Sequence, residues 1–324
     1  MSVTQSIKRP LVVLTGPTAV GKTKLSIALA KAIDGEILSA DSMQVYKHMD
    51  IGSAKIRPEE MQGVPHHLID ILEPWEEFNV VVFQKRCLEC MEQIYDRGHI
   101  PILVGGTGFY IQAVLRGIDF TENEENTEYR EKMEQLAKEK GPEVLHDMLR
   151  KIDPVSADNI HANNIKRTIR ALEYYELTGE PISAHNEREK ERTSPYNFSY
   201  FVLTDDREKL YARIETRIDE MLSEGLVEEV RSLKKLGCNR GMVSMQGLGY
   251  KEILEYLDGE CSLEEAVYTL KRDTRHFAKR QLTWFRRENE VTWLDKQRFD
   301  YDEEKILEYM IKELGEKGIY EKQQ

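Results

Sequence analysis

The sequence predicts an α/β fold: a P-loop NTPase-like core, with a parallel sheet flanked by helices, that carries an inserted all-helical domain. A glycine-rich loop at 16–23 stands between the apolar run Leu11–Leu14 and a helical pattern. Further short apolar runs alternate with helical patterns, which is typical of a parallel sheet. Residues 119–196 begin with the acidic residues Glu122, Glu124 and Glu125 and show no strand pattern. We therefore assign 1–118 and 197–324 to the catalytic core and 119–196 to the insertion.

Length and composition limit the class of protein. With 324 residues, of which 40% are apolar, the chain can build a large core and a second domain. No run approaches the roughly 18 apolar residues of a membrane span, and the first residues lack the apolar stretch of a secretory signal, so we expect a cytoplasmic protein. A net charge of −12 argues against a protein that coats nucleic acid over its whole surface, but a local basic patch remains compatible with it.

The four cysteines are too few and too scattered for a disulfide framework. Cys87 and Cys90 have the spacing of a C-x-x-C pair, but they lie in a helical pattern without a second Cys or His pair at zinc-ligand spacing. We therefore expect neither a zinc site nor a redox pair.

The glycine-rich loop has the spacing of a phosphate-binding loop. Its sequence is Gly16-Pro17-Thr18-Ala19-Val20-Gly21-Lys22-Thr23. Its glycines allow successive backbone N–H groups to face one concavity, and the positive end of the following helix points to the same place. Lys22 would reach the outer phosphate oxygens, and the Thr23 hydroxyl would bind a Mg²⁺ that bridges them. The pattern predicts a bound phosphate or diphosphate, but it does not identify the molecule that carries it.

Two further strands end in polar residues. Gly35–Ser39 runs into Asp41, and Ile100–Val104 runs into a Gly-Gly-Thr turn that contains Thr107. The carboxyl ends of parallel strands share one edge of the sheet, so both side chains would lie beside the phosphate loop. Alternatively, Asp41 caps the next turn and Thr107 only shapes its own turn. In many phosphate-loop NTPases a comparable strand ends in an acidic Mg²⁺-binding residue, and this strand does not.

Residues 51–74 form a mixed segment, which we expect to be loop and short helix near the site. The segment contains Ser53, Lys55 and the adjacent pair His66-His67. Adjacent side chains point in different directions on any regular element, so the two histidines are poor joint metal ligands, although either could touch substrate.

A later helical pattern starts at Arg207 and places Arg213 and Arg217 on one face, four residues apart. The two arginines could pair with Glu208 or Glu220 on a solvated surface. They could also close over phosphates, as in P-loop kinases. The sequence leaves both alternatives open.

Two basic clusters stand out in this acidic chain. One comprises Lys166, Arg167 and Arg170. The other lies on a helix predicted at 267–287, where residues 271–287 hold seven Lys or Arg against one Asp, an imbalance that favours contact with an anionic polymer over a solvated face. The basic stripe of this helix is Arg272, Arg275, Lys279 and Arg286, and its apolar stripe, which would face a core, is Val267, Leu270, Thr274, Phe277 and Phe285. A last short strand at 291–294 and a charged helix beyond residue 300 complete the chain.

Together these motifs resemble one family, the tRNA dimethylallyltransferases, also called tRNA isopentenyltransferases. The resemblance covers nearly the whole chain. It rests on Gly16-Pro-Thr-Ala-Val-Gly-Lys-Thr23, Ser39-Ala-Asp-Ser-Met-Gln-Val-Tyr46, Asp50-Ile-Gly-Ser-Ala-Lys55, Pro65-His-His-Leu-Ile-Asp70, Val104-Gly-Gly-Thr-Gly-Phe-Tyr110, Lys166-Arg-Thr-Ile-Arg-Ala-Leu172 and Ala278-Lys-Arg-Gln-Leu-Thr-Trp284.

The resemblance implies transfer of a dimethylallyl group from dimethylallyl diphosphate to N6 of the adenosine at position 37, next to the anticodon, in tRNAs. It implies that the phosphate loop holds the diphosphate with Mg²⁺ at Thr23, that Asp41 is the base on the adenine amine, and that Thr107 lies at the reacting centre. An arginine of the pair Arg213 and Arg217 would also reach the diphosphate. No other metal is implied. The implied tRNA contacts are Asp41, Ser42, Met43, Gln44, Thr107, Arg130, Lys166, Arg167, Thr168, Ile169, Arg170, Gln246, Gly247, Leu248, Gly249, Tyr250 and Lys251.

Three other functions fit parts of the sequence. A small-molecule or nucleotide kinase would use ATP at the same loop, but it leaves the basic helix unexplained. An RNA-binding module would make Asp41 dispensable, and transfer to a free adenine nucleotide would not need the inserted helices. We expect a monomer whose partners are dimethylallyl diphosphate and the tRNA anticodon stem-loop, without a membrane.

Overall fold

The computed structural model describes residues 8–120 and 127–321. They form two compact units, which we describe separately: unit 1 comprises Met1–Leu115 and Pro195–Gln324, and unit 2 comprises Arg116–Ser194. The acidic residues Glu122, Glu124 and Glu125 lie outside the described part. Within that part, no helix combines the length and the apolar character that a membrane crossing requires.

Unit 1 is built on a parallel sheet. In chain order, the strands of the described residues are β1 (Pro10–Thr15), β2 (Gly35–Ala40), β3 (His66–His67), β4 (Ile100–Gly105), β5 (Asn197–Thr204) and β6 (Val291–Asp295). They lie in the order β3-β2-β4-β1-β5-β6, and every pairing is parallel. The residues of β1 and β2 are almost all buried, as expected for a parallel sheet covered on both faces.

The strand register brings three chain segments to one point. Thr15 at the end of β1 lies opposite Gly105 at the end of β4, and Gly105 lies opposite Ala40 at the end of β2. The residues that follow these strands therefore leave the sheet at adjacent positions. This edge carries the phosphate loop, Asp41 and the Gly-Gly-Thr turn, as the parallel topology predicted.

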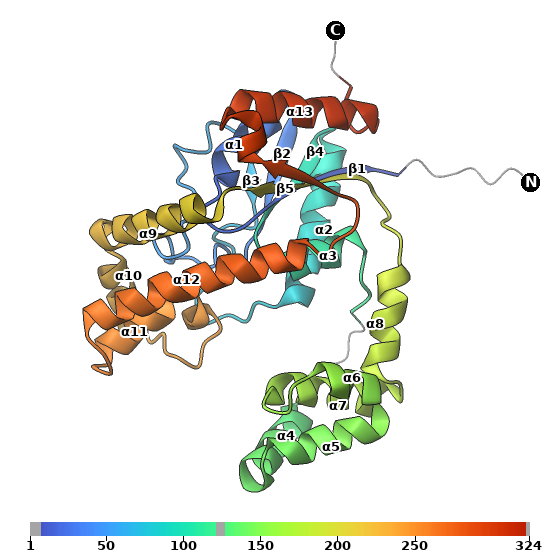
Figure 1. Ribbon diagram of the computed structural model, residues 1–324, viewed down its shortest axis with the longest axis vertical. Coiled ribbons are helices and arrows are strands. Elements are labelled where there is room, and N and C mark those ends of the chain that lie inside the picture. Colours follow the sequence, from blue (N-terminus) through green and yellow to red (C-terminus); the bar gives the residue numbers. More distant parts are fainter. Residues whose placement is uncertain (1–7, 121–126, 322–324) are drawn as a thin grey trace, which may run out of the picture. The chain divides into compact units, whose positions relative to one another are not determined.

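Helices cover both faces of the sheet. In Figure 1, α1 (Lys22–Ile33) and α13 (Glu303–Glu316) lie above it, and α2 (Val80–Asp96) and α3 (Gly108–Leu115) lie below it. The C-terminal helix α13 is amphipathic, with Ile306, Met310 and Leu314 fully buried, so this charged helix completes the core. The remaining helices of unit 1 are α9 (Arg207–Glu224), α10 (Leu226–Lys235), the short η1 (Ser244–Gln246), α11 (Tyr250–Leu257), α12 (Leu263–Phe285) and the short η2 (Lys296–Phe299).

The segment 51–74 differs from its prediction. It forms turns and the two-residue strand β3, with no α-helix between its ends. His66 and His67 are that strand, and His67 Nε2 lies 2.6 Å from a carboxylate oxygen of the buried Glu36. The pair therefore forms the edge strand of the sheet, and neither histidine lines the main cavity of unit 1.

Unit 2 consists of the helices α4 (Thr127–Lys140), α5 (Pro142–Ile152), α6 (Pro154–Asn159), α7 (Ile165–Thr178) and α8 (Ile182–Glu191). Buried side chains from α4, α5, α6 and α7 form its core, among them Leu145, Leu149 and Leu172. The buried Asp153 carboxylate accepts hydrogen bonds from the backbone and the hydroxyl of both Ser156 and Ser183, at 2.7 to 3.0 Å. One carboxylate thus links the first turns of α6 and α8.

Candidate active site

The phosphate loop is held tightly against the sheet. A Cβ at Gly16, whose φ is +148°, would lie 2.3 Å from the Leu203 carbonyl oxygen of β5, so only glycine fits there. Lys22 Nζ folds over the loop and donates to the carbonyls of Gly16 at 2.9 Å and Pro17 at 2.8 Å. Burial, reinforced by the nearby Arg217 guanidinium, lowers the pKa of Lys22 to about 7. An anion bound in the loop would oppose both effects and raise the pKa of Lys22.

Asp41 combines the two roles that the sequence left open. Its Oδ1 accepts hydrogen bonds from the backbone N–H of Met43 at 2.8 Å and of Gln44 at 3.4 Å, so it does cap the next turn. Asp41 also lines the main cavity of unit 1. In the described part of the chain, no group donates a hydrogen bond to its second oxygen, Oδ2, which leaves one carboxylate oxygen for another partner.

The Gly-Gly-Thr turn lies against Asp41. The backbone N–H of Thr107 donates to the Ala40 carbonyl at 3.3 Å, and the Thr107 carbonyl begins α3 by accepting from Tyr110 and Ile111. Thr107 lines the same cavity as Asp41. Its predicted place beside the phosphate loop is therefore observed.

The two arginines of α9 have different surroundings, and neither pairs with Glu208 or Glu220. Arg213 donates through Nε to the Ala19 carbonyl of the phosphate loop at 2.9 Å and pairs with the buried Asp205 at 2.7 Å. Arg217 lines the cavity, and the charge of Asp41 opposes the effect of burial, which lowers the pKa of Arg217. Arg213 is thus bound to the loop from outside, and Arg217 lies beside the open space.

These residues surround a cavity of about 600 Å³. One end carries the phosphate loop, Asp41 and Arg217. Apolar side chains form much of the remaining wall, including Ile214, Ile218 and Met221 of α9, Leu270 and Phe277 of α12, and Phe78. The cavity therefore joins an anion-binding end to a space that suits an apolar group or an aromatic base.

The predicted elbow at 246–251 forms another wall, except for one residue. Gln246, Gly247, Leu248, Gly249 and Lys251 line the cavity. Tyr250 is fully buried instead, and its hydroxyl donates to Glu229 at 2.8 Å. Its side chain is therefore part of the core, and a tRNA contact of Tyr250 stays a prediction.

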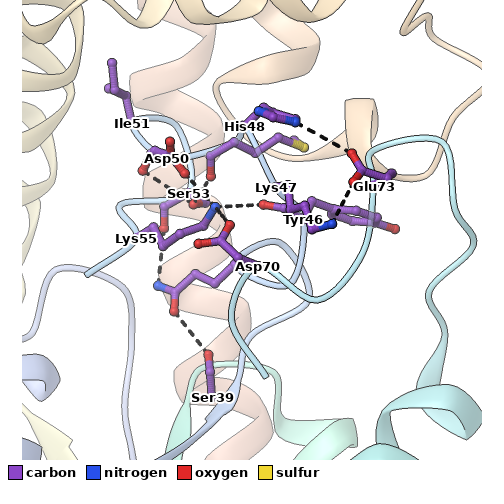
Figure 2. A network of polar contacts seen from close by, with 12 residues as sticks. Ser39, Tyr46, Lys47, His48, Asp50, Ile51, Ser53, Lys55, Asp70 and Glu73 are labelled. Atoms are coloured by element: carbon purple, nitrogen blue, oxygen red, sulfur yellow. Dashed lines mark hydrogen bonds and ion pairs between the residues drawn. The ribbon is translucent and has the colours of Figure 1, made fainter. Parts of the chain in front are cut away.

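The segment that follows Asp41 is fixed by a network of polar contacts (Figure 2). The side chain of Lys55 is 4% exposed and donates to the Tyr46 carbonyl at 2.7 Å, to Asp50 at 2.6 Å and to Asp70 at 2.5 Å. The amide of Gln44 bonds to the Ser39 hydroxyl at 3.1 Å and to backbone carbonyls at 3.4 Å. Lys55 therefore fixes the segment that borders the cavity, and the amide of Gln44 is hydrogen-bonded within the protein.

The first basic cluster lies in unit 2, at the start of α7. Lys166, Arg167 and Arg170 are exposed. Thr168 and Ile169 are 0% and 3% exposed because the helical period turns them into the core of the unit. Their side chains therefore belong to the core of the unit, and tRNA contacts of these two residues stay a prediction.

Arg130 of α4 also has a structural partner. It forms a bidentate ion pair with the buried Glu173 of α7, with distances of 2.8 to 3.0 Å. This pair joins two helices of unit 2, and a tRNA contact of Arg130 remains only a prediction.

The basic stripe of α12 is partly neutralised. Arg275 pairs with Glu215 at 2.6 Å, and Arg272 pairs with the adjacent Asp273 at 2.8 Å. Further along the chain, Lys279 and Arg280 of α12 and Arg287, just beyond its end, line a second hollow of about 490 Å³, and no carboxylate in the described part of the chain is within ion-pair distance of these three. The first part of the stripe is therefore engaged in ion pairs, and contact of the stripe with an anionic polymer stays a prediction.

Sequence reasoning misplaced or missed several cavity residues. Leu270 is buried as expected and also borders the cavity, whereas Thr274 and Phe277, which were expected to face a core, line the cavity. Gln281 was not predicted to be a site residue, although residues 270, 274, 277 and 281 have the spacing of one helix face. That spacing could have indicated that this face lines a cavity, because an apolar stripe that contains polar residues is unusual for a fully buried core.

Comparisons with known families agree over most of the chain. The model of the IPP transferase family matches residues 44–288, and that of the isopentenyl transferase family matches residues 10–71. The chain is 64% identical to the tRNA dimethylallyltransferase of Lachnoclostridium phytofermentans over 96% of its own length and 99% of that protein. It is 53% identical to the tRNA dimethylallyltransferase of Carboxydothermus hydrogenoformans, with 94% and 97% covered.

Solved structures agree as well. A full-length tRNA isopentenylpyrophosphate transferase from Bacillus halodurans shares 47% identity with a TM-score of 0.72, over 96% of this chain and 98% of that one. A eukaryotic dimethylallyltransferase, whose structures capture it acting on tRNA, shares 31% identity with a TM-score of 0.74, over 89% and 74% of the two chains.

Proposed function

Because this chain belongs to the tRNA dimethylallyltransferase family, we propose that it transfers a dimethylallyl group from dimethylallyl diphosphate to N6 of the adenosine at position 37 in tRNAs. Diphosphate is the other product. The observation that carries the proposal is the single cavity in which a phosphate loop, the carboxylate of Asp41 and an apolar wall meet.

The phosphate loop binds the diphosphate of the donor. Thr18 and Ala19 of the loop line the cavity, Lys22 lies close enough to Arg217 and Asp41 to interact with their charges, and Arg217 adds a guanidinium from α9. Arg213, which is held by the Ala19 carbonyl and Asp205, supports the loop from behind. We therefore assign the direct diphosphate contact to Arg217.

The donor set fits Mg²⁺. Thr23 is exposed in the first turn of α1, where its hydroxyl can serve as a ligand. Within the described residues, no group of three His, Cys, Asp or Glu is placed to hold a metal ion by itself. Mg²⁺ in such sites takes its other ligands from phosphate oxygens and water. When bound, it would neutralise charge that develops on the leaving diphosphate.

Asp41 acts as the base. A bond forms between N6 of adenine and the allylic carbon as the carbon–oxygen bond to diphosphate breaks, and the N6 proton passes to Asp41 Oδ2. The hydrogen bonds from Met43 and Gln44 to Oδ1 hold the carboxylate in place while Oδ2 remains available. Lys22 and Arg217 stabilise the electron pair that the diphosphate carries away. Thr107 lies at this reacting centre.

The tRNA supplies the second substrate from a loop whose base can leave its stack at modest cost. Ser42, Met43 and the elbow residues Gln246 to Gly249 and Lys251 border the cavity that would receive the base. Unit 2 exposes Lys166, Arg167 and Arg170, and a surface hollow is lined by Lys279 and Arg280 of α12 and by Arg287 just beyond it. These residues would contact RNA phosphates. We propose that the enzyme works in the cytoplasm as a monomer.

The kinase alternative does not fit the family. The strand β4 ends in a Gly-Gly-Thr turn without the acidic residue that helps hold nucleotide-bound Mg²⁺ in many phosphate-loop enzymes. The relatives named above are transferases that act on tRNA by their names.

One experiment tests the proposal directly. Unmodified tRNA, dimethylallyl diphosphate and Mg²⁺ are incubated with the protein, and the digested RNA is analysed by mass spectrometry. The expected result is one dimethylallyl group on the adenosine next to the anticodon and release of diphosphate. Unmodified RNA, together with turnover of ATP to ADP in a parallel incubation that contains ATP, would instead favour the kinase alternative.

A further inference from the structure

Gln281 makes two contacts that connect the two halves of the site. It lies on α12, its side chain is 7% exposed, and it lines the cavity. Its Oε1 accepts a hydrogen bond from the backbone N–H of Thr18 in the phosphate loop at 2.9 Å. Its Nε2 donates to the carbonyl of Gly106 in the Gly-Gly-Thr turn at 3.0 Å.

A carboxamide is the side chain that these partners require. The Thr18 N–H needs an acceptor and the Gly106 carbonyl needs a donor, and the amide group of glutamine offers both on adjacent atoms. A carboxylate would place a negative charge against the Gly106 carbonyl. An apolar side chain of the same length would leave two buried backbone groups without partners.

The neighbouring glycine shows how closely the chain is packed around this amide. A Cβ on Gly106 would lie 2.2 Å from Gln281 Nε2, and the next residue it would meet is Gly16, whose carbonyl oxygen is 3.7 Å away. The φ of Gly106 is outside the left-handed region, so an alanine meets no backbone strain there. The Gln281 side chain is therefore the one close obstacle to a larger residue.

We propose that Gln281 is a positioning residue that fixes the phosphate loop relative to the Gly-Gly-Thr turn. The loop carries the donor diphosphate and the turn carries Thr107, so one amide sets the separation between the donor and the reacting centre. Because Gln281 belongs to α12, this separation also depends on the position of that helix. The inference rests on the proposed function, since it assigns those roles to the loop and the turn.

The first test replaces Gln281 by methionine, which keeps the side-chain volume and removes both hydrogen bonds. We expect the affinity for inorganic diphosphate with Mg²⁺, measured by calorimetry, to fall. The kcat/KM for the donor should fall by at least about tenfold, the scale expected when two buried polar groups lose their partners. Gln84→Met is the matched control, because Gln84 Nε2 also donates to a backbone carbonyl, that of Ala113 at 2.8 Å, outside the cavity.

The second test is a double-mutant cycle. Gly106→Ala should impair the parent because its Cβ displaces the Gln281 amide, but it should cost little in a Gln281→Ala background, where the space is open. We expect the effects on kcat/KM to be strongly non-additive, with a coupling of about fivefold or more. Circular dichroism checks each fold, and if Gln281→Ala does not fold, the comparison of Gln281→Met with Gln84→Met decides alone.

Additive effects in the cycle, or equal behaviour of Gln281→Met and Gln84→Met, would overturn the inference. A lower melting temperature with unchanged diphosphate affinity and unchanged kcat/KM would also overturn it, because a merely structural role predicts that result. Failure of the parent protein to prenylate tRNA would refute the proposed function instead. The diphosphate-binding comparison would then still report on the contact between Gln281 and the loop.

Discussion

Replacing Asp41 by asparagine tests the proposed chemistry at a single oxygen atom. Asparagine keeps the acceptor that the backbone N–H groups of Met43 and Gln44 use, at 2.8 and 3.4 Å, so the turn should remain folded. It converts Oδ2, the oxygen assigned as base, into an NH₂ group that cannot accept the N6 proton. General-base catalysis contributes about 10² to 10⁴ in rate, so we expect the single-turnover rate constant to fall by at least about 10².

The assay is single-turnover prenylation of an anticodon stem-loop at saturating donor and RNA, so that binding does not limit the rate. Asp302→Asn is the matched control, because Asp302 caps α13 with the same pattern, accepting from Glu304 N at 2.9 Å and Lys305 N at 3.3 Å. The control should react at the parent rate. An Asp41→Asn rate within about threefold of the parent would show that Asp41 is a turn cap and not the base.

Three further predictions follow from the site and the fold. Arg217→Gln should weaken donor binding by about 10- to 100-fold, the worth of a charge-assisted hydrogen bond, and leave tRNA affinity unchanged; unchanged donor affinity by calorimetry would remove Arg217 from the diphosphate site. Alanine at Lys166, Arg167 or Arg170 should each flatten the log–log salt dependence of RNA binding by about 0.7, whereas a slope equal to the parent's would mark a solvated face. The bidentate hydrogen bond from Arg97 holds the pKa of Glu36 below its ordinary value, so its contribution to stability is present above about pH 4.3 and is lost as the pH falls through the lowered pKa. Urea unfolding of Glu36→Gln at neutral and acidic pH checks this prediction. The variant should have a lower free energy of unfolding than the parent at neutral pH, and that free energy should change less between neutral and acidic pH. An equal pH dependence in the two proteins would contradict the assignment.

The sheet could be predicted from sequence because each long strand is an apolar run that ends in a glycine or polar turn. Leu11–Leu14 and Ile100–Val104 are examples, and their parallel arrangement correctly placed Asp41 and Thr107 beside the loop. The strand β3 was missed because two histidines carry no periodic signal. The segment around it folds through side-chain contacts over long sequence distances, such as Lys55 with Asp70, which no local pattern reveals.

The site was predicted where it depends on local motifs and missed where it depends on distant contacts. The burial of Thr168 and Ile169 could have been predicted, because Ile165, Ile169 and Leu172 mark the core face of the helix by their spacing. The different roles of Arg213 and Arg217 could not have been predicted from the sequence, since they depend on contacts with Asp205 and with the Ala19 carbonyl.

The helix α12 shows why the two substrates can depend on one element. Leu270, Ala278 and Phe285 are buried and anchor it in unit 1. One face carries Phe277 and Gln281 into the cavity, and another carries His276 and Lys279 into the second hollow. A helix is stiff over these few turns, so a shift that changes the hollow also changes the position of the Gln281 amide against Thr18 and Gly106. Under the proposed function, RNA that binds the hollow would therefore act on the same rigid body that holds the donor loop in place.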